Sequence, residues 1–118
     1  MKRTSLLCAR VLLACSQVLS QKSVKYAVDA WEILDTAFYT WVMDRTDDIE
    51  ALVAQGRQEQ AKLVFNKLDR ALKVWLPLKD EIEKRLTMAA RGKAINREDL
   101  NVLFQDARNF LASLGIEK

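Results

Sequence analysis

The sequence predicts an all-α protein, an antiparallel three-helix bundle with two long helices and a shorter C-terminal helix. Only 3 glycines and 1 proline occur in 118 residues, while the residues that favour helices are abundant. From residue 23 onward, apolar side chains recur every three or four positions in three segments, which is the period of an amphipathic helix. Short turns separate these segments, so neighbouring helices should pack antiparallel within one domain over residues 23–118.

The first long helix is expected from about Ser23 to Arg45. Its apolar stripe consists of Val24, Val28, Trp31, Leu34, Phe38 and Val42. Tyr26, Tyr39 and Trp41 widen this stripe, and such a broad apolar band indicates contact with more than one neighbouring helix. An alternative interpretation is a binding surface, in which Tyr39 and Trp41 are the candidate partner-binding residues.

The end of the first helix has two alternatives. Asp47 and Glu50 match a capping box, which favours a break near Thr46 and a restart. Otherwise the helix continues to Gln55. In both cases Gly56 should form the turn, because glycine readily adopts the positive φ of a helix C-cap.

The second long helix is expected to begin near Arg57. Its apolar seam consists of Ala61, Phe65, Leu68, Leu72, Trp75, Ile82, Leu86 and Ala89. Pro77 lacks an amide hydrogen and clashes with the preceding turn, so it predicts a kink or a break near Trp75. Lys79 interrupts the seam, and the charged residues around it are expected to form exposed pairs four residues apart, such as Lys79 with Glu83.

The C-terminal helix should begin after Asn96, a favourable N-cap, and end at Gly115 and Ile116 in a Schellman motif. Its apolar stripe consists of Leu100, Leu103, Phe104, Ala107, Phe110, Leu111 and Leu114. This helix is about half as long as the other two. One end of the long hairpin should therefore stay uncovered, which makes that end a candidate partner surface.

The N-terminus has the order of a secretory signal: a basic start at Lys2 and Arg3, an apolar run, and then Leu12-Leu13-Ala14-Cys15. This stretch resembles the lipobox of bacterial lipoproteins. The resemblance covers residues 1 to about 20 and implies a signal peptide over 1–14 and acylation of Cys15, with palmitate among the attached chains. It further implies a tether over 15–22, and a serine after the cysteine is typical of lipoproteins sent to the outer membrane.

Two other interpretations of the N-terminus stay open. Arg10 lies within the apolar run, and the chain has no acidic residue before Asp29, which is also typical of a mitochondrial presequence. Alternatively, the segment is an uncleaved amphipathic helix, and the protein is cytoplasmic or membrane-peripheral.

Charge and composition limit the chemistry of the domain. Three of the 19 basic residues precede Cys15, so the rest of the chain has 16 residues of each sign, which argues against nucleic-acid binding. The chain has no histidine and no glycine-rich phosphate loop, so we expect no catalytic site and no cofactor. The acidic residues Asp44, Asp47 and Asp48 are expected to cap helices rather than to bind a metal.

These observations predict a lipid-anchored, non-enzymatic helical binding protein of the bacterial envelope. Small helical lipoproteins of this kind include pilotins of secretion systems and exclusion proteins of phages or plasmids. The expected contacts are a protein partner in the envelope, the membrane through the lipid, and a second copy of the chain in a homo-oligomer. The alternative is an uncleaved helical adaptor protein inside the cell.

Overall fold

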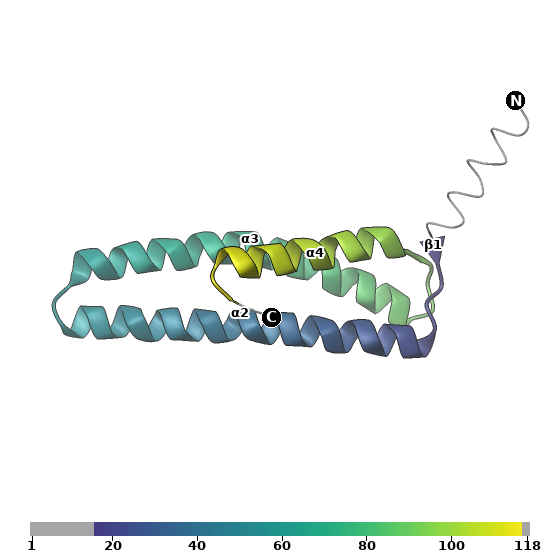
Figure 1. Cartoon of the computed structure of the whole chain (residues 1–118), viewed down its shortest axis with the longest axis horizontal. Helices are drawn as coiled ribbons and strands as arrows, with labels where there is room; N and C mark the ends of the chain where they lie inside the picture. The colour runs from purple at the N-terminus through teal and green to yellow at the C-terminus, as the bar shows by residue number, and fades with distance from the viewer. Residues whose placement is uncertain (1–15, 117–118) are drawn as a thin grey trace, which may run out of the picture.

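The computed structural model describes residues 16–116, which form three helices and one pair of short strands (Figure 1). In chain order the elements are β1 (Ser16–Gln17), α2 (Gln21–Ala54), α3 (Gln58–Ala90), β2 (Ile95–Asn96) and α4 (Arg97–Ser113). The helices contain 34, 33 and 17 residues. The prediction of a mainly helical chain with two long helices and a third of half their length is therefore confirmed.

The strand pair was not predicted. β1 and β2 pair antiparallel, with Ser16 opposite Asn96 and Gln17 opposite Ile95. Residues 15–22 were expected to form a tether, but the described part of this segment consists of β1, a short connection and the first turn of α2, capped by Ser20. The prediction of a tether is therefore wrong for this part. The backbone of β1 pairs with that of β2, which is fixed to the domain by the buried side chain of Ile95.

α2 is one continuous helix, so the second of the two alternatives for its end is correct. No break occurs at Thr46, whose hydroxyl donates a hydrogen bond to the carbonyl oxygen of Val42 one turn earlier (2.9 Å). The helix ends at Gly56, which has a φ of 74°, while the amide of Arg57 donates to the carbonyl of Leu52. This is the predicted glycine cap.

α3 continues through Pro77 without a break. In Figure 1 its two halves run in different directions, and the second half slopes behind α4. A proline inside a helix removes one backbone hydrogen bond and pushes against the preceding turn, so a bend is the expected response. The alternative of two separate collinear helices is wrong.

α4 has both predicted caps. The side chain of Asn96 accepts a hydrogen bond from the amide of Asp99 (3.0 Å). At the other end Gly115 has a φ of 84°, and the amide of Ile116 donates to the carbonyl of Leu111 (2.9 Å). These bonds satisfy backbone groups that the end of a helix leaves without partners.

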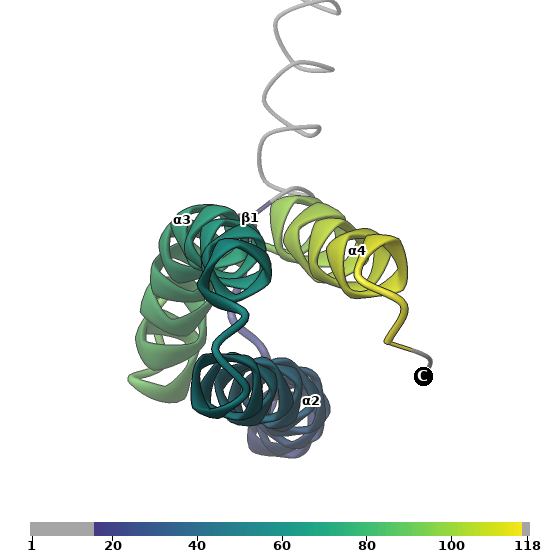
Figure 2. The same cartoon turned by 90° about the vertical axis from the view of Figure 1, so that its left-hand side faces the viewer.

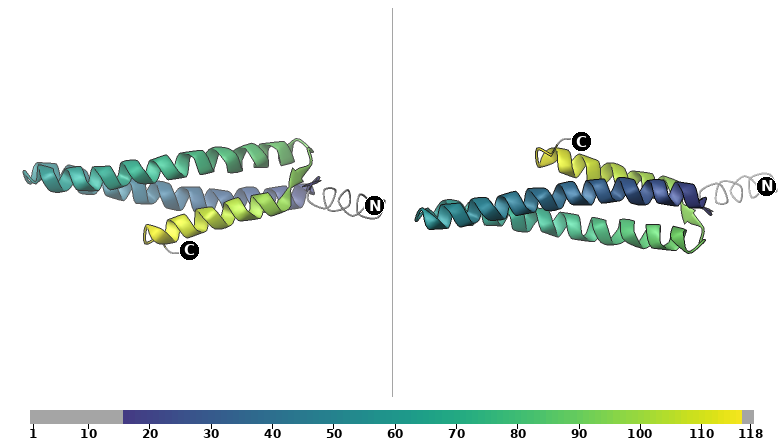
Figure 3. Two further views of the ribbon diagram at one scale, coloured as in Figure 1. Left: turned by 90° about the horizontal axis from the view of Figure 1, so that it is seen from above. Right: turned by 90° about the horizontal axis from the view of Figure 1, so that it is seen from below.

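The helices are arranged as a long hairpin with a short third helix at one end. α2 and α3 run side by side in opposite directions, and α4 lies along the half of the hairpin that contains the strands (Figures 1 and 3). Viewed end-on, α4 leans toward α3 and leaves a wedge between itself and α2 (Figure 2). The other end of the hairpin, around Gly56, is not covered by α4 (Figure 3).

The core is a column of stacked aromatic rings. Trp75 and Phe38 are both fully buried, with ring centroids 4.6 Å apart, and Trp31 stacks on Trp75 at 5.4 Å. Phe104 and Phe110 of α4 contact this column at 6.3 and 6.2 Å. Such large rings bury much apolar surface, so the column is a major source of hydrophobic stabilisation in this core.

The predicted stripes are confirmed at most of their positions. The buried residues shared by prediction and structure are Trp31, Leu34, Phe38, Ala61, Leu68, Trp75, Ile82, Leu86, Ala89, Leu100, Phe104, Ala107 and Leu111. The seam prediction is wrong at Phe65, which is 55% exposed. The Phe65 ring does not pack against the core, whereas Leu63, which is nearer to Gly56, lines a groove together with Leu114 of α4.

Candidate functional site

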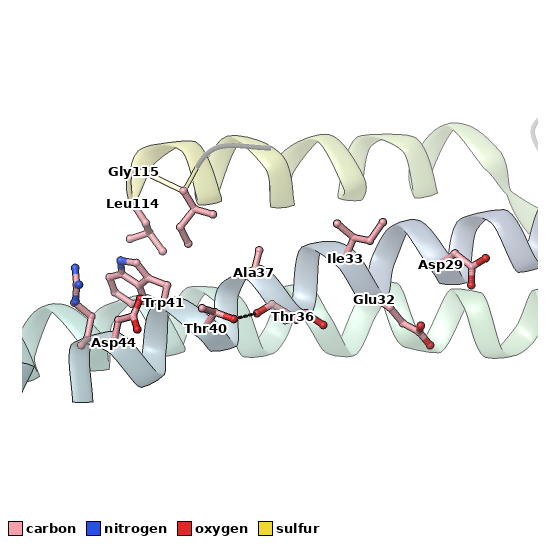
Figure 4. A pocket seen from close by; sticks show the side chains of 12 residues that line it. Asp29, Glu32, Ile33, Thr36, Ala37, Thr40, Trp41, Asp44, Leu114 and Gly115 are labelled. Atoms are coloured by element: carbon pink, nitrogen blue, oxygen red, sulfur yellow. Dashed lines mark hydrogen bonds between the residues drawn. The ribbon is translucent and has the colours of Figure 1, made fainter. Parts of the chain in front are cut away.

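A groove about 940 Å³ in volume runs along the wedge between α2 and the end of α4. Its floor is made of Ile33, Ala37 and Trp41, and the last residues of α4 close one end (Figure 4). Three carboxylates line it, those of Asp29, Glu32 and Asp44. We call this surface the acidic groove, defined by the residues Asp29, Glu32, Ile33, Thr36, Ala37, Thr40, Trp41, Asp44, Arg45, Leu114, Gly115 and Ile116.

The three carboxylates have no compensating cation in the groove. Among the residues that the structure describes, none of the three forms an ion pair, and the one basic side chain in the lining, Arg45, is already paired with Asp48 (3.0 Å). The groove therefore combines an apolar floor with an unneutralised negative rim. Such a surface favours a partner that is both basic and apolar.

Trp41, predicted to bind a partner, is only 7% exposed and belongs to the core. Its ring stacks on Phe38 at 5.9 Å, while the Arg45 guanidinium lies 5.8 Å from its centroid. One edge of the ring lines the acidic groove (Figure 4). The interpretation of the broad apolar band as a core face therefore holds at Trp41, and only the edge of the ring that lines the groove is accessible to a partner.

The indole nitrogen of Trp41 is buried and has no hydrogen-bond partner. In Figure 4 it lies on the side of the ring nearest Leu114. A buried donor without an acceptor costs about 1–3 kcal/mol. This end of the groove therefore contains a buried hydrogen-bond donor that no acceptor among the described residues satisfies.

Tyr39, the other predicted partner-binding residue, lies on the opposite side of α2 from the groove floor and is 39% exposed. Its ring packs edge-on against Phe38 at 5.9 Å, and the Lys79 ammonium lies 5.0 Å from its centroid. The structure therefore does not bring Tyr39 and Trp41 into one surface.

A polar cluster joins α2 to α3 beside the aromatic column. Asp35 of α2 accepts hydrogen bonds from the Trp75 indole (3.0 Å) and from the Lys79 ammonium (2.8 Å). In return, Glu83 of α3 accepts one from the Trp31 indole (3.1 Å) and lies 3.6 Å from the Lys79 nitrogen. Both stacked tryptophans thus have their N–H groups satisfied by carboxylates of the facing helix.

Sequence reasoning found only one contact of this cluster, the pair of Lys79 and Glu83. Asp35 lies outside the apolar stripe of its helix, so the sequence pattern alone indicates an exposed residue there. The available signal was the position of Lys79 inside an apolar seam, because a lysine there requires a partner of opposite charge. That partner lies 44 residues away in sequence, and no periodicity within one helix identifies it.

The cluster raises the pKa of Lys79 above its ordinary value of 10.5. The main cause is the hydrogen bond to Asp35, supported by the nearby carboxylates of Asp35 and Glu83 and opposed by partial burial. Since the folded pKa lies above the unfolded one, the contribution of Lys79 to stability is complete below pH 10.5. It is lost as the pH rises through the folded pKa.

We therefore expect the stability difference between wild type and Lys79→Met to depend on alkaline pH. The wild type should be more stable by about 1 kcal/mol at pH 8, and this advantage should shrink as the pH rises above 10.5. The measurement is urea unfolding followed by circular dichroism at each pH. A difference that stays constant as the pH rises well above 10.5 would contradict the assignment.

Residues 16–116 contain neither a cluster suited to a metal ion nor a helix able to span a membrane. No group of three or more Asp, Glu or Cys side chains in this range is placed to hold a metal ion, and Asp48 instead pairs with Arg45. Within the same range, no helix is both long enough and apolar enough to cross a bilayer.

Comparison of the chain with protein-family models, with curated proteins and with solved structures gives no match.

Proposed function

We propose that the protein is a lipid-anchored, non-enzymatic helical binding protein of the bacterial envelope. The observation that carries this proposal is the order of the N-terminal sequence, in which Leu12-Leu13-Ala14-Cys15 follows a basic start and an apolar run. In this interpretation residues 1–14 are removed and Cys15 carries the lipid, in the outer membrane. These residues lie outside the described part of the chain.

The position of β1 at one end of the molecule supports this proposal. Ser16, the residue after Cys15, pairs with Asn96 next to the start of α4. The opposite end of the hairpin, at Gly56, is about 50 Å away along α2. We further propose that the three helices act as one open antiparallel bundle, presenting the acidic groove to a protein partner in a pilotin-like or exclusion-type role.

The absence of an enzymatic role is part of the proposal. The chain has no histidine. The best-defined polar cluster, around Asp35 and Lys79, joins two helices and satisfies two buried indoles. Its groups are therefore engaged in holding the fold together.

The intact mass of the protein from the membrane fraction of an expressing bacterium tests the proposal. Wild type should lack residues 1–14 and carry added acyl mass, whereas Cys15→Ala should show neither change. Cys8→Ala is the matched control, because it removes the other cysteine and should still be processed. An unmodified wild-type chain that begins at Met1 would reject the lipid anchor.

A second candidate function is an uncleaved helical adaptor inside the cell or on a membrane surface. The observation that favours it is the β1–β2 pairing, because Ser16 and Gln17 are held against the domain and leave no free tether after Cys15. The same mass measurement decides between the two candidates.

A further inference from the structure

We propose that the protein self-associates, with the acidic groove of one copy binding a basic stripe on α3 of a second copy. The basic stripe consists of Leu63, Lys67, Arg70 and Val74. The inference goes beyond the proposed envelope function, and it does not depend on whether Cys15 is acylated.

The basic stripe is one continuous face of α3. Its residues are four, three and four positions apart, a spacing that places them on the same side of a helix. Leu63 is 68% exposed and Val74 is 49% exposed, so both ends of the stripe are apolar and accessible. Lys67 and Arg70, between them, form no ion pair within residues 16–116.

The stripe is also bordered by apolar side chains of α4. Together with Ala71 of α3, Phe110 and Leu114 of α4 line a shallow groove of about 500 Å³ around it. No acidic residue belongs to this lining. The surface is therefore positive and apolar, whereas the acidic groove on the other side of α4 is negative and apolar.

The acidic groove is lined along α2 by a row of residues on one side of that helix. Asp29, Ile33, Thr40 and Asp44 follow a helical spacing along its floor and rim, and Ile33 is 55% exposed. Thr36, Ala37 and Thr40 have small side chains, which let the backbone of a docking helix approach closely. In the proposed contact, Leu63 or Val74 of a second copy would cover the exposed side chain of Ile33.

The two surfaces also agree in length and in sign. The row from Asp29 to Asp44 extends about 22 Å, and the stripe from Leu63 to Val74 about 16 Å, so the stripe fits within the groove. Each surface has charges that its own molecule leaves unpaired, and these charges are opposite. Because the two patches differ, one copy uses its groove while its neighbour uses its stripe, which is a heterologous contact.

Two charge-reversal variants of the full-length chain test this contact. The groove variant combines Asp29→Lys and Asp44→Lys, and the stripe variant combines Lys67→Glu and Arg70→Glu. Sedimentation equilibrium at 50 mM NaCl measures the dissociation constant of each protein. Each variant alone should bind itself about tenfold or more weakly than wild type, because either reversal gives the groove and the stripe of one protein charges of the same sign.

An equimolar mixture of the two variants gives the decisive result. The reversed groove of the first variant is positive and the reversed stripe of the second is negative, so the mixture should associate again with an affinity near that of wild type. Raising NaCl to 0.5 M should weaken association in wild type and in the mixture alike. The mixture also combines the unchanged stripe of the first variant with the unchanged groove of the second, so restored binding supports a contact between a groove and a stripe.

The control variant combines Lys25→Glu and Lys62→Glu, which change the net charge as much as the stripe variant but line neither surface. It should associate as wild type does. The proposal is overturned by a wild type that stays monomeric at millimolar concentration, by reversal variants that associate like wild type, or by a mixture that stays dissociated. Far-ultraviolet circular dichroism confirms that each variant is folded before the comparison.

Discussion

Replacing Trp75 with alanine should lower the free energy of unfolding by about 4 kcal/mol, the largest effect expected from any single substitution in this chain. Trp75 is fully buried and stacks on both Trp31 and Phe38. Its removal leaves a large cavity at the centre of the aromatic column. It also removes one of the two donors that Asp35 accepts from, which adds to the loss.

Urea unfolding of wild type and Trp75→Ala, followed by circular dichroism, measures this loss. Because domains of this size are stable by about 5–15 kcal/mol, the melting temperature should fall by about 15 °C or more. Leu76→Ala is the matched control, since Leu76 is the next residue and is 48% exposed. Its cost should stay below about 1 kcal/mol. A loss of less than 1 kcal/mol for Trp75→Ala would place the centre of the core elsewhere.

Replacing Asp35 with leucine should cost about 2–3 kcal/mol, although the change adds apolar surface. The Asp35 side chain is 18% exposed and accepts from both Trp75 and Lys79. Its loss leaves an indole N–H and a partly buried ammonium without their main acceptor. Asp35→Asn keeps an acceptor for the indole and loses only the opposite charge, so its cost should be nearer 1 kcal/mol.

A double-mutant cycle of Asp35→Asn and Lys79→Met isolates the interaction between these two side chains. We expect a coupling free energy of about 1 kcal/mol. The pair of Asp69 and Lys73 is the control, because both its side chains are largely exposed, 46% and 75%, and its cycle should give less than about 0.5 kcal/mol. Equal coupling in both cycles would show that the cluster contributes no more than a surface ion pair.

The helices and their ends are the part of the fold that the sequence predicts well. The apolar period of each helix is a local property, and Asn96, Gly56 and Gly115 act through bonds within a few residues. The bend associated with Pro77 is local for the same reason. These features depend on the chain near them and can therefore be found without knowledge of the other helices.

The features that the sequence does not predict depend on which segments meet in space. The β1–β2 pair is held by backbone hydrogen bonds, so its side chains give little signal. Asp35 looks like a surface acid until Trp75 and Lys79 of another helix are placed beside it. Phe65 matches an apolar seam, but its ring is exposed and does not pack against the core. For Trp41 both a core position and a binding surface stayed open, because periodicity alone does not tell how many neighbours a helix has.

The acidic groove is predictable from the sequence only in part. Its carboxylates and small residues are visible in the sequence at helical spacing, but nothing in the sequence indicates that α4 leans toward α3 and leaves α2 open. The partner surface was instead expected at the uncovered end of the hairpin. The groove lies beside α4, where three acidic side chains and an exposed isoleucine share one opening.

The β1–β2 pair has a consequence for the order of events during synthesis. Ser16 pairs with Asn96, so β1 has no partner until about 80 further residues have been made, which takes about 4–16 s at ribosomal speeds. The helical hairpin of α2 and α3 forms from contacts nearer in sequence and can precede it. The β1–β2 pair is therefore a late step of folding, and until it forms the segment that begins at Ser16 lacks the backbone partners it has in the final structure.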